Sequence, residues 1–178
     1  MKKVVALFAF LLILVSCDSP APLEYYKRCV LNTVYLQHYG VTEILEILGK
    51  PPLKYNESKR NFDTVDYQQV VKEKIQYEQS LLKNVEGLKA TADAKKMIDA
   101  SKDVFNTVIK GEQELYLPLA KMKDEKADAA DIQGKAFRML DQPEKDVQQK
   151  LDLLWGYGKI YADANGIDLT LHKKGENK

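Results

Sequence analysis

The chain has 178 residues, a length typical of one domain, and its formal charge at pH 7 is +1. We expect Lys2 and Lys3 to be removed with a leader, which leaves 25 of the 27 basic side chains against 26 acidic ones. Because nucleic-acid binding depends on clustered basic side chains that neutralise phosphates, this balance argues against a nucleic-acid partner.

The first residues of the chain have the layout of a secretory signal. Met1 is followed by two lysines, and residues 4–15 form an unbroken apolar run. This run is too short to span a membrane as a helix, which needs about twenty apolar residues. A basic start, a short apolar run and a small residue before the cleavage site are typical of export signals. We therefore predict that residues 1–16 are a signal peptide that is removed.

The four residues Leu14-Val15-Ser16-Cys17 resemble the lipobox of bacterial lipoproteins. In that class the cysteine is linked to diacylglycerol, the signal is cut directly before it, and its amine is usually acylated. The resemblance implies fatty acyl chains such as palmitate on Cys17, and two or more such chains hold a protein stably on a membrane. Asp18 resembles the inner-membrane retention signal of enterobacteria, which other phyla do not follow. The choice between inner and outer membrane, and between periplasm and cell surface, therefore stays open.

A short tether and one helical domain are expected after the signal. Residues 17–22 are predicted to be the lipidated cysteine and a stiff spacer, because Pro20 and Pro22 disfavour a helix. The helical domain is expected over residues 23–171, and a polar tail over residues 172–178.

The first helix of this domain is predicted from an apolar face that runs from Tyr26 to Leu48, with spacings of mostly three, four or seven residues. Gly49 and the two prolines after it are expected to end this helix. Residues 50–63 are polar and show no clear period, so they are interpreted as a loop.

Three further apolar faces predict the remaining helices, over residues 71–88, 97–122 and 127–165. Pro118 is expected to kink the third helix, and Pro143 either divides the fourth segment or bends it. Four amphipathic segments with turns between them indicate an all-α fold. The predicted architecture is an antiparallel four-helix bundle with long, partly kinked helices.

The sequence shows no spacing that is typical of a metal or haem site. It lacks the Glu-x-x-His pairs of di-iron bundles, and its only histidines are His38 and His172. A haem held by His38 and a methionine is conceivable, but methionines that fill gaps in the core are the simpler interpretation. Cys29 is expected to be a buried, inert thiol. The sequence therefore predicts no metal, no cofactor and no enzyme activity.

Tyrosine is unusually frequent, with ten residues. Tyr35 and Tyr39 are four residues apart on one helix face, and Trp155 and Tyr157 lie next to helical glycines. Because tyrosine and tryptophan are favoured in interfaces, these four residues form the candidate binding surface. The alternative is that their rings lie at the core boundary with hydroxyls in water, and that the glycines serve close helix packing.

The second half of the chain carries three further features: Lys89-Ala90 after Val85-Glu86-Gly87-Leu88, the helical stretch 114–118 that ends in proline, and the segment 161–169. In these features it resembles a group of small, uncharacterised, all-helical surface lipoproteins of spirochaetes and Bacteroidetes. The resemblance implies an envelope location and a helical bundle, and it carries no catalytic residue.

These observations predict a membrane-anchored envelope lipoprotein that acts as a non-catalytic binding or structural module. Its expected partners are the membrane, through the lipid on Cys17, and an envelope protein or a surface partner. The alternative is a small-molecule or haem carrier in the bundle core. An enzyme would need convergent polar groups that the sequence does not reveal.

Overall fold

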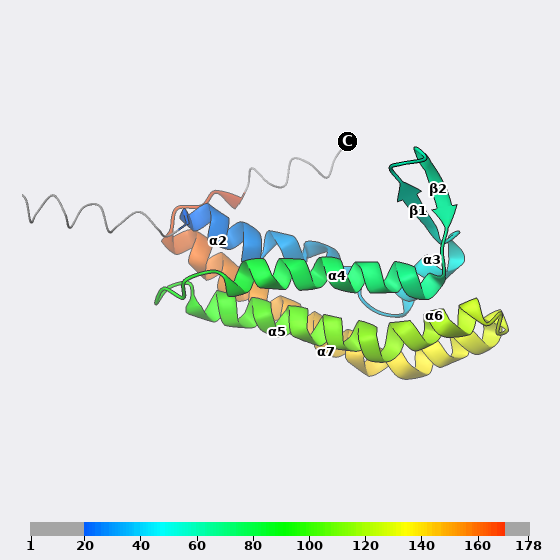
Figure 1. The fold of residues 1–178 in the computed structure, drawn as a ribbon. Helices are drawn as coiled ribbons and strands as arrows, with labels where there is room; N and C mark the ends of the chain where they lie inside the picture. Colours follow the sequence, from blue (N-terminus) through cyan, green and yellow to red (C-terminus); the bar gives the residue numbers. More distant parts are fainter. Residues whose placement is uncertain (1–19, 170–178) are drawn as a thin grey trace, which may run out of the picture.

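The computed structural model describes residues 20–169, which form a mainly helical structure with one small sheet (Figure 1). The prediction of a mainly α fold is confirmed. The expected signal peptide 1–16, the lipid-bearing Cys17 and the polar tail 172–178 lie outside the described residues. Within the described part, no helix combines the length and the apolar character that crossing a membrane requires.

The first helical segment is not one helix, so this part of the prediction is wrong. Helix α2 (Pro22–Cys29) leads into a 3-10 helix (Leu31–His38), and α3 (Val41–Gly49) follows. The break falls at Gly40, whose φ of +142° is accessible to glycine and strained for other residues. The apolar spacing continues across this break, which is why the sequence pattern suggested a single helix.

Residues 50–63 were expected to be a loop, but they contain most of a β-hairpin. Strand β1 (Leu53–Asn56) pairs antiparallel with β2 (Asn61–Thr64). Figure 1 shows this hairpin projecting from the helices next to α3. The prediction missed the strands because their apolar side chains point to solvent, so the pattern does not match a strand that covers a core.

The third predicted helix is interrupted before its proline. Helix α4 (Tyr67–Glu86) is followed by α5 (Lys95–Gly111), a π-helix (Glu112–Tyr116) and α6 (Leu117–Asp124). Pro118 lies in the first turn of α6. The irregularity expected at this proline therefore takes the form of a π-helix directly before it.

The fourth predicted segment is one long helix, α7 (Ala129–Ala164), which continues through Pro143. At 1.5 Å per residue its 36 residues extend about 54 Å. Asp128 caps its first turn by accepting a hydrogen bond of 2.8 Å from the Ala130 amide. Of the two alternatives for Pro143, the structure has the single helix.

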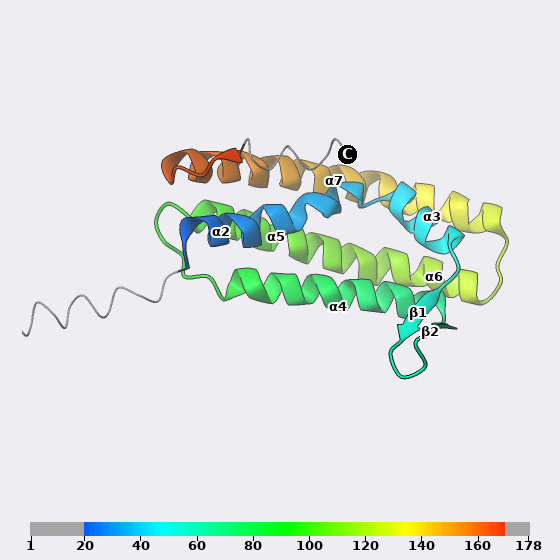
Figure 2. The same cartoon turned by 90° about the horizontal axis from the view of Figure 1, so that it is seen from above.

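Helices α4, α5 with α6, and α7 lie side by side along the molecule, as Figure 2 shows from above. The segment from α2 to α3 packs over α4, α5 and α7. Between these layers lies an apolar core whose fully buried members include Val71, Phe105, Leu140 and Leu151. Where α3, α4 and the π-helix approach one another, a group of polar side chains interrupts the apolar core.

Candidate functional site

Tyr35 and Tyr39, which were predicted to form a surface, turn their hydroxyls into the protein. Both hydroxyl groups are buried and lack a hydrogen-bond partner among the described residues. The Tyr39 ring is 3 % exposed and stacks on Tyr116, with ring centroids 5.3 Å apart. The Tyr35 ring lies under the ammonium of Lys74, 5.3 Å from its centroid. Both tyrosines therefore border a buried charged group.

This group, called here the Lys74 cluster, consists of Lys74, Glu43, Glu78 and Glu112. The Lys74 ammonium lies 2.6 Å from Glu78 Oε1, 2.9 Å from Glu112 Oε1 and 3.1 Å from Glu43 Oε1. The Glu78 and Glu112 side chains are fully buried, whereas Lys74 and Glu43 are 17 % and 16 % exposed. Burial disfavours the ammonium, but the attraction of the three carboxylates outweighs it and raises the pKa of Lys74.

The carboxylates of the Lys74 cluster outnumber its cation, and some of their oxygens have no donor. The Lys74–Glu112 contact is close enough for strong attraction but lacks hydrogen-bond geometry. Glu78 Oε2 and both Glu112 oxygens therefore have no hydrogen bond within the described residues. A proton on Glu112 supplies the missing donor, since it can be shared with Glu78. Burial and this hydrogen bond raise the pKa of Glu112 to about 9.

Sequence reasoning missed the Lys74 cluster, although one signal for it was present. Glu78 lies in the apolar stripe of α4 between Ile75 and Leu82, and it is fully buried. Glu112 likewise extends the buried stripe of α5 beyond Val108. A carboxylate in a core stripe indicates a buried partner, because an unpaired buried charge is costly.

The Lys74 cluster is joined to the start of α3 and to α7. The Tyr116 hydroxyl accepts a hydrogen bond of 2.8 Å from the Gly40 amide and lies 3.0 Å from Glu43 Oε2. Glu144 of α7 accepts a hydrogen bond of 3.0 Å from the Val41 amide. A Cβ at Gly40 would lie 2.0 Å from Glu144 Oε2, and the φ of +142° is strained for any other residue, so glycine is favoured at this junction.

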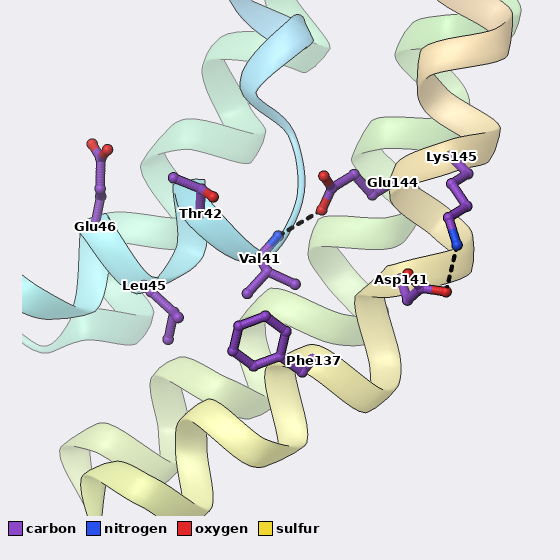
Figure 3. Close-up of a pocket in the computed structure, with 8 residues that line it drawn as sticks. All are labelled: Val41, Thr42, Leu45, Glu46, Phe137, Asp141, Glu144 and Lys145. Atoms are coloured by element: carbon purple, nitrogen blue, oxygen red, sulfur yellow. Dashed lines mark hydrogen bonds and ion pairs between the residues drawn. The ribbon is translucent and has the colours of Figure 1, made fainter.

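A groove of about 690 Å³ opens on the outer side of this junction, between α3 and α7. Figure 3 shows the eight side chains that line this α3–α7 groove: Val41, Thr42, Leu45, Glu46, Phe137, Asp141, Glu144 and Lys145. Phe137 is 55 % exposed and faces Val41 and Leu45, and together they form an apolar wall. Carboxylates rim this wall. The ammonium of Lys145 pairs with Asp141 at 2.8 Å.

A second groove, of about 540 Å³, lies where α5 and the π-helix meet α7 near Pro143. Tyr39 and Gly111 form part of its lining, and they are in close contact. A Cβ at Gly111 would lie 2.0 Å from the Tyr39 hydroxyl oxygen. The small residue thus lets the Tyr39 ring approach the helix that carries Glu112.

Trp155 and Tyr157 do not join the two predicted tyrosines. Trp155 is twelve residues beyond Pro143 on α7, which corresponds to about 18 Å. Its indole N–H is buried without a partner in the described part of the chain, and the Tyr157 ring lies 5.9 Å from the Lys96 ammonium. Of the neighbouring glycines, Gly158 serves close packing, since its Cβ would lie 2.7 Å from Val30, whereas Gly156 has open space.

The residues considered for redox or nucleophilic chemistry are also placed apart. Cys29 is fully buried in the core, and burial raises the pKa of its thiol to about 12. His38 is exposed at the end of the 3-10 helix, whereas Met97 is buried. Among residues 20–169, no group of three or more His, Cys, Asp or Glu side chains is arranged to hold a metal ion.

Comparison of the chain with models of protein families, with curated proteins and with solved structures finds no match.

Proposed function

We propose that this chain is a lipid-anchored lipoprotein of a bacterial cell envelope and acts as a non-catalytic binding or structural module. The lipid on Cys17 would hold it on the membrane, and the α3–α7 groove would contact another envelope protein or a surface partner. We also infer that the helices form an antiparallel four-helix bundle, in which the broken segment from α2 to α3 counts as the first helix.

The observation that carries this proposal is the exposed Phe137 ring on the apolar wall of the α3–α7 groove. Phe137 is 55 % exposed and lies beside Val41, which is buried, and Leu45, which is partly buried. Exposed apolar surface with a polar rim is typical of interaction sites. Because Glu46 and Glu144 are part of the rim, a partner that presents an apolar side chain beside a basic one fits the groove.

The anchor is tested by replacing Cys17 with alanine. We expect the wild type to lack residues 1–16, to gain lipid mass and to sediment with membranes, because acyl chains hold it there. The variant should leave the membrane fraction. Intact mass spectrometry and fractionation measure both properties. A wild type that is unlipidated and found in the soluble fraction would refute the anchor and reopen a Cys17–Cys29 disulfide.

The groove is tested by photo-crosslinking in cells from a benzoylphenylalanine at position 137. Position 160 serves as the matched control, because Ile160 is also on α7, is 67 % exposed and does not line the groove. We expect a discrete adduct from position 137 that weakens when Glu46→Lys reverses a rim charge. Equal adduct patterns from both positions would count against the groove as the binding surface.

A further inference from the structure

The β1–β2 hairpin has one apolar and one polar face. Its register places Tyr55 opposite Phe62 and Leu53 opposite Thr64, so their side chains lie on one face. The two aromatic rings meet edge to face with centroids 5.4 Å apart. Leu53, Tyr55 and Phe62 are 50 %, 51 % and 58 % exposed. We call these three side chains the hairpin's apolar face.

The hairpin turns its polar face, not its apolar face, toward the helices. Lys54, which lies opposite Asp63, pairs with Glu73 of α4. On the same face Asn56 donates a hydrogen bond of 2.6 Å to Asp63, which also accepts one of 3.0 Å from Lys59. A hairpin that served only to cover the helices would have the opposite arrangement, because sheets normally pack their apolar face on the core. The outward apolar face therefore needs another partner.

The size of the apolar face fits a lipid surface better than a second protein. Three half-exposed side chains offer on the order of 300 Å² of apolar surface, whereas a stable protein interface buries about 800 Å² on each partner. Tyr and Phe are suited to the boundary between headgroups and acyl chains. Arg60 lies at the hairpin's tip, and its guanidinium has no ion-pair partner among residues 20–169, so it is available to a lipid phosphate.

The position of the hairpin allows this contact. In both views it projects away from α7, at the end of the molecule opposite the start of α2 (Figures 1 and 2). Five residue steps separate Cys17 from the first residue of α2, Pro22, which holds that end of the molecule within about 18 Å of the anchored lipid. A molecule attached at one end can therefore tilt until its long axis is parallel to the bilayer and the hairpin contacts the same membrane.

We propose that the hairpin's apolar face inserts into the headgroup region of the membrane that holds Cys17, so that the helices lie along the bilayer with α7 facing away from it. This proposal rests on the proposed lipid anchor. The contact would give the protein a fixed orientation, because it would be held at both ends.

The test uses the mature, lipidated chain in vesicles of phosphatidylethanolamine and phosphatidylglycerol. One variant carries a fluorophore at the hairpin tip through Ser58→Cys, and the control carries it on α7 through Ile160→Cys. Cys29 is fully buried and should not be labelled. We expect doxyl-labelled lipids to quench the Ser58 label about twofold or more over the Ile160 label. Adding Tyr55→Ser and Phe62→Ser should abolish the difference while the protein stays on the vesicles.

Equal quenching of both labels on a protein that carries lipid mass would overturn the hairpin proposal and leave the anchor intact; it would indicate a protein as the partner of this face. Absence of lipid mass on Cys17 would overturn the anchor, and the hairpin proposal with it. Circular dichroism of the double serine variant confirms that the helices are retained.

Discussion

Replacement of Lys74 by methionine is expected to lower the free energy of unfolding by about 3–5 kcal/mol. Methionine fills a similar volume but removes the only cation of the Lys74 cluster, so the carboxylates of Glu43 and Glu78 would lose their counter-charge beside the protonated Glu112. Glu78 is fully buried and cannot be solvated without opening the structure. Urea unfolding of the mature chain in the Cys17→Ala background, followed by circular dichroism, measures the change.

Lys159→Met is the matched control for this substitution. Lys159 pairs with Asp163 at 2.7 Å, but both side chains are mostly exposed, and exposed pairs contribute little. A second variant that combines Lys74→Met with Glu78→Gln and Glu112→Gln replaces both fully buried carboxyl groups by neutral amides and leaves only the partly exposed Glu43 carboxylate, so it should regain most of the lost stability. Similar small effects of Lys74→Met and Lys159→Met would show that the Lys74 cluster is not a buried charged network.

The helices could be predicted where their apolar faces turn inward. The spacings over residues 71–88 and 97–109 correspond to buried stripes of α4 and α5, and those of residues 132–161 to α7. Pro143 gave two alternatives because a proline removes one backbone hydrogen bond whether a helix bends or ends there. Whether the helix continues through Pro143 depends on the tertiary packing on both sides of the proline, and the local sequence pattern carries no information about that packing.

The hairpin and the Lys74 cluster could not be predicted for a different reason. Leu53, Tyr55 and Phe62 do alternate with polar residues. Sequence rules interpret such alternation as a strand whose apolar face covers a core, so they do not predict a hairpin whose apolar face points to solvent. The Lys74 cluster depends on α3 being offset at Gly40, which brings Glu43 to Lys74. Glu78 and Glu112 carried a local signal, whereas their meeting with Glu43 is a property of the tertiary structure.

The stability of the protein is expected to fall as pH rises from about 5 to about 8. An unfolded Glu112 ionises near its ordinary pKa of 4.5, whereas the folded side chain keeps its proton up to about pH 9. Between these values the folded state holds one more proton than the unfolded state. Each pH unit then lowers the free energy of unfolding by up to about 1.4 kcal/mol. Lys74 does not contribute in this range, because its raised pKa makes its stabilisation fade only above pH 10.5.

Glu112→Gln separates this effect from the other ionisable groups. The glutamine amide still donates a hydrogen bond to Glu78 but has no proton to lose, so the slope between pH 5 and pH 8 should become shallower by about one proton. Glu114→Gln, two residues away and exposed, is the matched control and should keep the wild-type slope. Urea unfolding midpoints at several pH values measure how the stability of each variant changes with pH. Parallel profiles for Glu112→Gln and the wild type would show that Glu112 is ionised in the folded protein, and that Lys74 alone balances the buried carboxylates.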